Sequence, residues 1–214
     1  MAEANKSEIV ASHVSREIRV DAANPAAEWQ TAQPIRFSAD WQGGNPEPAL
    51  ETEVRVLWSP GMLLLRFVCS YRQLFFFHDS DPNGRRDHLW DRDAAEAFLQ
   101  PEPSPERYYK EFEIAPNGMW IDLEISPSGL AHLKSGLTRS VHIDAEKQIW
   151  TAEMAIPLHA ITKQFDPSSA WRANFYRIEG PEEPRRYMAW RPTHTPQPNF
   201  HVPQAFGTMR FEAD

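Results

Sequence analysis

Cysteine and glycine are scarce in this 214-residue sequence. Cys69 is the only cysteine, which excludes an intramolecular disulfide and a multi-cysteine zinc site. It lies in the apolar run Phe67-Val68-Cys69-Ser70, which predicts a strand with a buried, inert thiol. The 9 glycines form no glycine-rich phosphate loop.

Basic residues and long apolar runs are also few. Lys and Arg number 22 against 30 Asp and Glu, a net charge of −8, which argues against a nucleic-acid partner. No apolar stretch is long enough to span a bilayer, so no membrane partner is expected. Glu3, Lys6 and Glu8 stand where a signal peptide would be apolar. We therefore expect a cytoplasmic location, or a secreted or periplasmic one if a leader has been removed.

Proline and tryptophan, in contrast, are plentiful. The 19 prolines predict short elements joined by stiff loops, because proline removes a backbone donor and breaks helix interiors. The 8 tryptophans predict an aromatic core or aromatic surfaces that hold a ligand. Hydrophobic residues make up 41% and charged residues 24%, which is typical of a globular protein.

The sequence pattern predicts strands from Arg16 onward. Three hairpins stand out, and further strands are expected at 94–99, 173–178, 187–190 and 208–211, with one short helix at 157–165. The predicted hairpins join 53–58 to 62–69, 110–114 to 119–125, and 141–143 to 149–156. Many short strands between Pro and Gly turns predict an all-β antiparallel β-sandwich of immunoglobulin-like or jelly-roll type. Residues 1–16 are expected to be a flexible N-terminal tail, and 17–214 one β-sandwich domain.

Several passages in order along residues 17–211 resemble the family-nine carbohydrate-binding modules, part of the DOMON-like group of β-sandwiches. The ending carries Trp190-Arg191-Pro192-Thr193 and then Phe206-Gly207-Thr208. The other matching passages are Ile18–Asp21 with Glu28-Trp29, Leu89–Leu99, Trp150–Leu158, Trp171–Phe175 and Pro198–Pro203. Their order and spacing over the whole chain carry the resemblance.

The resemblance implies a ligand site. In characterised members two aromatic rings sandwich the terminal sugar of a glucan or xylan, and polar side chains hold its hydroxyls. Trp90 falls where one ring would be and Glu96 where a hydroxyl-binding carboxylate would be. The sequence departs from the family pattern at two places: Phe200 stands in place of the second ring's tryptophan, and Glu113 in place of an arginine.

A pyranose suits such a site because aromatic faces attract its C–H groups while charged and amide groups bind its hydroxyls. We therefore expect non-catalytic binding of a saccharide in a cleft at one end of the sandwich, formed by loops. Trp90 and Phe200 would stack on the sugar and Glu96 would accept hydrogen bonds, with Asn199 and Arg191 assisting. Neither a cofactor nor a required metal is expected.

Each of these residues also has a purely structural interpretation. Trp90 could plug the end of the sandwich, and Phe200 could hold the C-terminal strand against the core. Glu96 shares a strand face with Phe98 and would need a partner if buried, which Arg172, Arg177 or Arg92 could supply.

Three alternative functions remain open. Asp91-x-Asp93-x-x-Glu96 could hold structural calcium, although it does not fit an EF-hand, and relatives of this group hold calcium. Glu96 with Asp91 or Asp93 could form the carboxyl pair of a glycoside hydrolase. A DOMON-like domain could also bind a protein, or bind haem through the strand candidates Met119, Met154, Met188 and His142.

Overall fold

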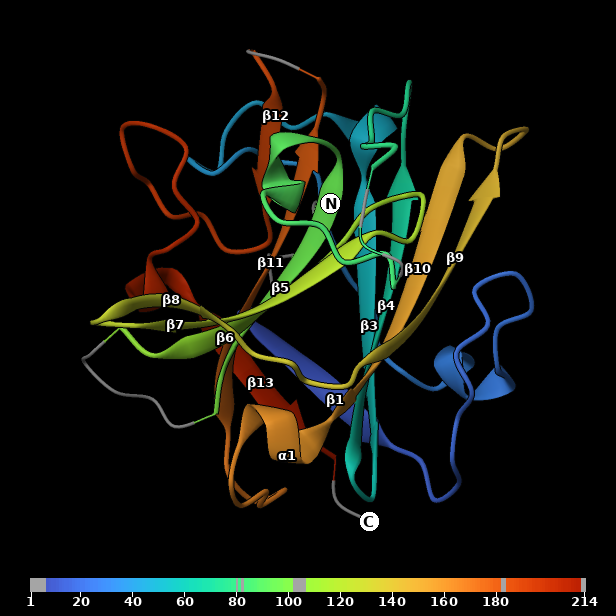
Figure 1. The fold of residues 1–214 in the computed structure, drawn as a ribbon, viewed down its shortest axis with the longest axis vertical. Coiled ribbons are helices and arrows are strands. Elements are labelled where there is room, and N and C mark those ends of the chain that lie inside the picture. Colours follow the sequence, from blue (N-terminus) through green and yellow to red (C-terminus); the bar gives the residue numbers. More distant parts are fainter. Residues whose placement is uncertain (1–6, 80, 82, 102–106, 182–183, 213–214) are drawn as a thin grey trace.

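The computed structural model describes residues 7–79, 81, 83–101, 107–181 and 184–212, and it is built almost entirely of strands (Figure 1). The described elements are one short helix, α1 (Leu158–Ile161), and the strands β1 (Glu8–His13), β2 (Ile35–Phe37), β3 (Thr52–Ser59), β4 (Met62–Ser70), β5 (Ala94–Gln100), β6 (Tyr109–Ile114), β7 (Trp120–Ser126), β8 (Gly129–His132), β9 (Thr138–Asp144), β10 (Ile149–Pro157), β11 (Trp171–Glu179), β12 (Arg186–Ala189) and β13 (Gly207–Phe211).

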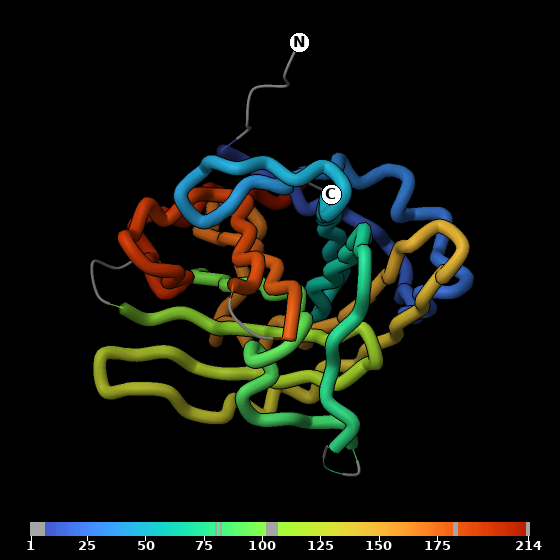
Figure 2. Tube along the Cα trace, turned by 90° about the horizontal axis from the view of Figure 1, so that it is seen from above, coloured from blue at the N-terminus to red at the C-terminus, as the bar shows by residue number. Residues whose placement is uncertain are grey.

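These strands form a single curled sheet in the order β8-β7-β6-β5-β11-β13-β1-β3-β4-β10-β9, with β12 beside β11 and β2 beside β3. The curl brings two halves face to face, β5 to β8 on one side and β3, β4, β9 and β10 on the other (Figures 1 and 2). Most neighbouring strands are antiparallel, whereas β1 runs parallel to both of its neighbours, β13 and β3. The predicted all-β sandwich with one short helix is confirmed.

The N-terminal segment differs from the prediction. Residues 8–13, expected within a flexible tail, form β1, which joins the two halves of the sheet. Ile9 and Ala11 are buried in the core, and residues 8–11 pair with 208–211 at the other end of the chain. The prediction was wrong because six residues show little periodicity and their partner strand is remote in sequence.

The main core fills the space between the two halves. Ala95, Ala97 and Leu99 of β5 face it, together with large side chains such as Trp150 and Phe175. Cys69 is fully buried there, and burial raises the pKa of its thiol to about 11. The predicted inert thiol is thus explained by the absence of water around it.

A second core covers the opposite face of the β5–β8 half. Phe98, Tyr109, Leu123 and Tyr176 point to this face, and Phe206 in the C-terminal loop packs on them. Phe98 lies 5.4 Å from Tyr109 in a stacked arrangement and 4.9 Å from Tyr176 edge to face. The loops of residues 190–206 therefore cover part of a strand face, and the candidate site forms there.

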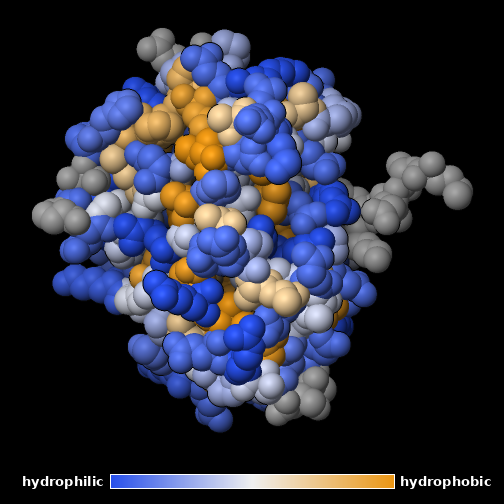
Figure 3. All heavy atoms as spheres, turned by 90° about the vertical axis from the view of Figure 1, so that its right-hand side faces the viewer, coloured by the Kyte–Doolittle hydropathy of each residue, from blue (hydrophilic) through white to orange (hydrophobic). Residues whose placement is uncertain are grey.

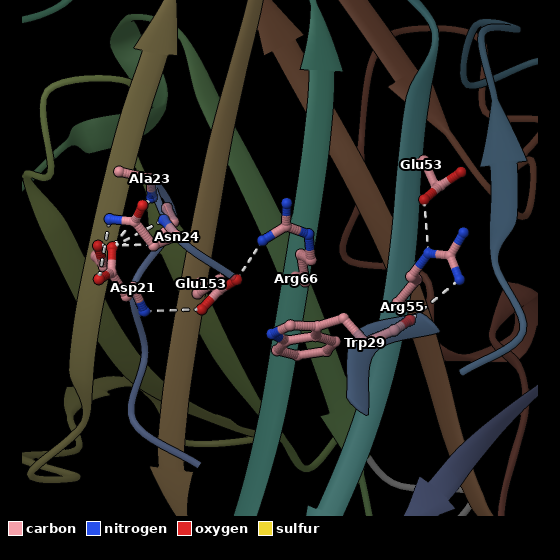
Figure 4. A network of polar contacts seen from close by, with 10 residues as sticks. Asp21, Ala23, Asn24, Trp29, Glu53, Arg55, Arg66 and Glu153 are labelled. Atoms are coloured by element: carbon pink, nitrogen blue, oxygen red, sulfur yellow. Dashed lines mark hydrogen bonds and ion pairs between the residues drawn. The ribbon is translucent and has the colours of Figure 1, made fainter. Parts of the chain in front are cut away.

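The outer face of the other half is covered by the N-terminal segment that follows β1. Trp29 from this segment is buried against β3 and β4. Glu153 of β10 accepts hydrogen bonds from Arg66 of β4 and from the backbone N–H of Asp21, the latter at 2.9 Å (Figure 4). These contacts fasten an otherwise irregular segment to the sheet.

The side of the molecule that carries β9 and this N-terminal segment is mostly hydrophilic, with hydrophobic side chains visible between polar ones in broken strips (Figure 3). It faces away from β5–β8 and the C-terminal loops. No helix among the described residues has the length and apolar character needed to cross a membrane.

Candidate functional site

A cavity of about 210 Å³ lies over the second core. Its floor comes from β5, β6 and β11, and its rim from the turn before β5, the start of β12, the β7–β8 hairpin and the loop after Arg191. The lining residues are Trp90, Glu96, Phe98, Glu111, Leu130, Ile178, Tyr187, Pro198, Asn199, Phe200 and His201. The cleft was expected at one end of the sandwich between loops, whereas the structure places it on a strand face that those loops only partly cover.

Trp90 is held at the rim by its neighbours in the chain. Leu89, just before it, is fully buried in the second core, so the short 3-10 turn Leu89–Asp91 carries the next side chain outward. Arg185 donates a hydrogen bond of 2.7 Å to the Trp90 carbonyl and fixes the turn from the other side. The indole remains partly exposed and lines the cavity, as a ring that contacts a ligand must.

Phe200 also lines the cavity, but most of it is used for packing. It stacks on Tyr176 with ring centroids 4.1 Å apart and an angle of 11° between the planes, and only 7% of the residue is exposed. The Tyr176 hydroxyl donates to the Phe200 carbonyl at 3.0 Å. One face of Phe200 is thus occupied by Tyr176 of β11, so the ring clamps its own loop onto that strand rather than holding the C-terminal strand against the core.

Three glutamates lie together beneath the cavity. In the β5–β6 register Glu96 is opposite Glu113 and Phe98 is opposite Glu111, so all three carboxyls share one face of the sheet. They are almost completely buried, with Glu113 fully so. Oε1 of Glu96 and Oε2 of Glu111 have no hydrogen-bond partner in the described part of the chain, although both residues line the cavity.

Burial and mutual repulsion govern the ionisation of these groups. Burial, and then the charge of Glu111, raises the pKa of Glu96 well above its usual range, while Arg185 opposes this. Burial and the neighbouring carboxyls also raise the pKa of Glu113 well above its usual range. Burial raises the pKa of Glu111 to about 7, against the opposing effects of a hydrogen bond with the Glu113 side chain and of the charge of Arg107. The cluster therefore keeps protons at pH values where ordinary glutamates are fully ionised.

His201 contributes a polar edge to the same cavity. Its Nδ1 lies 2.6 Å from the Tyr109 hydroxyl and 3.9 Å from Oε2 of Glu111. Burial, and secondarily the charge of Arg107, lowers the pKa of His201 to about 4. The imidazole is thus neutral at neutral pH and offers no positive charge to Glu111.

The structure brings together four of the six residues singled out from the sequence. Trp90, Glu96, Asn199 and Phe200 line one cavity. Glu113 lies beside Glu96 beneath it, and Arg191 is not among the lining residues. The Arg191 backbone instead exchanges hydrogen bonds with the side chain of Asn174, at 3.0 Å to its N–H and 2.9 Å to its carbonyl.

Glu111, Tyr187 and Leu130 are among the lining residues that were not predicted from the sequence. Glu111 alternates with Glu113 along β6, so the strand pattern placed both on one face, but the sequence did not reveal that β6 pairs beside Glu96. Tyr187 supplies a second partly exposed ring and packs edge to face on Phe200 at 6.1 Å. Leu130 on β8, 51% exposed, forms part of the rim on a strand that was not predicted.

The residues considered for calcium do not fit a metal site. Oδ1 of Asp93 accepts the Gly180 N–H at 2.8 Å, and Oδ2 accepts the Phe75 N–H at 3.2 Å. Oδ2 also lies 3.8 Å from the Arg177 guanidinium. Across the described ranges no group of three or more His, Cys, Asp or Glu side chains could hold a metal ion. Asp93 is a structural group that ties a loop to the sheet, whereas Glu96 belongs to the cavity.

The structure does not bring together the residue sets that the sequence suggested for haem binding and for hydrolysis. Met154 and Met188 are buried in the main core, Met119 packs in the second core and His142 is exposed, so these four do not converge on one pocket. Neither Asp91 nor Asp93 lines the cavity with Glu96. The acidic residue that does so is Glu111.

A β-sandwich whose strand face carries a small cavity with partly exposed aromatic rings and buried carboxyl acceptors is the architecture of a carbohydrate-binding module. The sequence profile of carbohydrate-binding family 9 matches residues 51–211. The chain belongs to carbohydrate-binding family 9. The family and the carbohydrate-binding class predicted from the sequence are thereby confirmed.

Known proteins similar to this chain agree with the assignment of the fold. A candidate carbohydrate-binding protein from Bacteroides uniformis superposes with a TM-score of 0.72 at 18% identity, covering 96% of this chain and 99% of the other. A family-nine module from Caldicellulosiruptor kristjanssonii, solved with cellotriose, superposes with a TM-score of 0.67 at 12% identity over 97% of this chain and 94% of the other. A family-nine module from the same organism, solved with glucose, superposes with a TM-score of 0.65 at 12% identity over 97% of this chain and 96% of the other. An extracellular protein of Arthroderma benhamiae is 24% identical over 205 residues, 87% of this chain and 88% of the relative.

Proposed function

We propose that the cavity binds one terminal or single unit of a glucan- or xylan-type saccharide and leaves its glycosidic bonds intact. The observation that carries this proposal is the joint position of Trp90 and Glu96 in one cavity, where a partly exposed indole and a buried carboxyl oxygen with no hydrogen-bond partner among the described residues line the same space. The bound cellotriose and glucose of the structurally similar Caldicellulosiruptor modules support the ligand class.

The size of the cavity favours a single sugar unit. Pockets for drug-sized ligands usually measure about 300–1,000 Å³, whereas this one measures about 210 Å³. Trp90 and Tyr187 would offer ring surface to the pyranose C–H groups. Glu96 and Glu111 would bind hydroxyls, since a polar group buried without a partner is costly and a ligand hydroxyl relieves that cost.

A fluorescence titration tests the proposal directly. Glucose, cello-oligosaccharides and xylo-oligosaccharides are added to the protein, and the change in tryptophan emission is followed. At least one series should bind with a Kd on the order of micromolar to millimolar. Trp90→Ala removes a ring that would pack on the sugar and should weaken binding roughly tenfold or more, a loss of about 1.4 kcal/mol or more in binding free energy.

Trp120→Ala is the matched control. Trp120 is also partly exposed, but it packs between Arg85 and Arg139 and donates to the Asn83 carbonyl at 3.1 Å, outside the cavity lining. Its loss should leave affinity unchanged. Equal loss in both variants, or no response to any sugar, would overturn the assignment of the site.

A separate measurement addresses catalysis. The protein is incubated with chromogenic aryl glucosides and xylosides and with the oligosaccharides that it binds, and products are followed. We expect no release above the buffer rate. Release that disappears in Glu96→Gln would instead establish a hydrolase.

A further inference from the structure

The described residues that line the cavity include acidic side chains but no cationic one. Glu96 and Glu111 supply two carboxyls, and Glu113 lies beside Glu96 on the neighbouring strand. None of the described lining residues is Lys or Arg, and His201 is neutral. Buried acidic groups in proteins normally have a cationic or hydrogen-bonding partner, yet Oε1 of Glu96 and Oε2 of Glu111 have none among the described residues.

The charged groups around the three glutamates do not act as cationic partners inside the cavity. Arg185 is engaged at the rim, where it donates to the Trp90 carbonyl and lies 5.3 Å from the centre of the Tyr187 ring. Arg107 acts on Glu111 and His201 from an exposed position beside β6. Asp91 adds further negative charge near Glu113. Neither arginine lines the cavity.

We propose that this cavity prefers a saccharide unit carrying a primary ammonium group, as in a 2-amino-2-deoxyhexose, with the ammonium placed between Glu96 and Glu111. This inference rests on the proposed function, because the ring of the sugar would still pack on Trp90 and Tyr187. An ammonium group has three hydrogen-bond donors and one positive charge. It can therefore satisfy the two carboxyl oxygens that lack a hydrogen-bond partner among the described residues better than a hydroxyl can.

The ionisation of the cluster makes the preference detectable. Because burial raises the pKa of Glu111 to about 7 and the pKa of Glu96 well above its usual range, much of the cluster is protonated below neutral pH. A cationic ligand favours the ionised carboxylates, so its binding should release protons to the buffer. A neutral sugar carries no positive charge, so its binding should release far fewer protons.

Calorimetric titrations with D-glucosamine, N-acetyl-D-glucosamine and D-glucose test this inference. D-Glucosamine should bind at least tenfold more tightly than N-acetyl-D-glucosamine near neutral pH, with affinity increasing between about pH 5 and pH 7, where an aliphatic amine stays charged. Titration in buffers of different ionisation enthalpy should show proton release for D-glucosamine. Glu111→Gln should bring the affinity ratio of the two amino-sugar forms close to one.

The controls separate this inference from the proposed function. Thermal unfolding of Glu111→Gln checks that the variant folds, and Glu8→Gln, a substitution of an exposed glutamate that does not line the cavity, should keep the wild-type ratio. Equal or weaker binding of D-glucosamine, with glucose or cello-oligosaccharides still bound, would overturn the ammonium preference alone. Failure of every sugar to bind would overturn both.

Discussion

Glu96 and Glu113 lie directly opposite each other on the adjacent antiparallel strands β5 and β6, and both are buried. Like charges at directly opposite positions of a sheet repel each other, and burial strengthens that repulsion. Burial is the main cause that raises the pKa of both carboxyls well above normal, and the charges of neighbouring glutamates add to it, Glu111 acting on Glu96 and both Glu96 and Glu111 acting on Glu113. The pair retains protons in the folded protein, and this gives the fold a pH dependence of its own.

The stability of the protein should decrease as the pH rises from about 6.5 to 8.5. An unfolded glutamate has a pKa of about 4.3, whereas folding raises the pKa of Glu111 to about 7. The folded state therefore binds more protons in this window, and the free energy of unfolding falls as they dissociate. The lowered pKa of His201 acts in the opposite direction only below its unfolded pKa of about 6.5.

Thermal unfolding followed by circular dichroism at several pH values checks this prediction. The Tm of Glu111→Gln should change less over the same window than that of the wild type. A wild-type Tm that stays constant or rises between about pH 6.5 and pH 8.5 would contradict the raised pKa values of the glutamates in the folded state.

Phe200→Ala should destabilise the fold, because this ring is largely buried against Tyr176. Removing a buried phenylalanine costs about 3–5 kcal/mol in typical cores. Urea denaturation measures the loss, with Leu130→Ala as a matched control, since Leu130 lines the same cavity but is exposed. A change below about 1 kcal/mol would mean that Phe200 does not clamp the loop.

Glu153→Ala should also destabilise the protein, by roughly 2–4 kcal/mol, because it leaves buried donors without an acceptor. The donors are the Arg66 guanidinium and the N–H of Asp21 (Figure 4). Glu153→Gln keeps an acceptor oxygen and should lose less. Equal losses in the two variants of Glu153, measured by denaturation, would assign the effect to packing alone.

Gly207→Ala should be destabilising because of close packing rather than backbone conformation. A Cβ at Gly207 would lie 2.6 Å from Cη2 of Trp190 and 2.8 Å from the Ser7 carbonyl oxygen. Overpacking of this kind typically costs about 1–3 kcal/mol. Gly44→Ala is the control, because its nearest neighbour would be an Asp40 oxygen at 3.8 Å. Similar Tm values for the two variants would contradict the predicted clash.

Cys69 should not react with a thiol reagent in the folded protein. The residue is fully buried, and its pKa of about 11 leaves little thiolate at moderate pH. Labelling with a chromogenic disulfide reagent should be complete in denaturant and very slow without it. Rapid labelling of the native protein would show that the surrounding strands open easily.

The sequence by itself determined the strands whose alternation is local, and with them the fold class. The hairpins at β3–β4, β6–β7 and β9–β10 are defined by turn residues and apolar alternation within a few positions, so they could be predicted. The order of passages such as Trp190–Thr193 carried the family. Trp90 and Glu96 could be placed by that resemblance.

Only the tertiary structure decided the rest, because it depends on pairing between distant segments. β1 is a strand because β13 and β3 lie beside it, and no local pattern encodes this. Glu111 and Tyr187 enter the site because β6 and β11 both flank β5, and β12 pairs with β11. The stacking of Phe200 on Tyr176 depends on where a proline-rich loop folds back. The register of β5 against β6 places three glutamates side by side and gives the cavity its acidic floor.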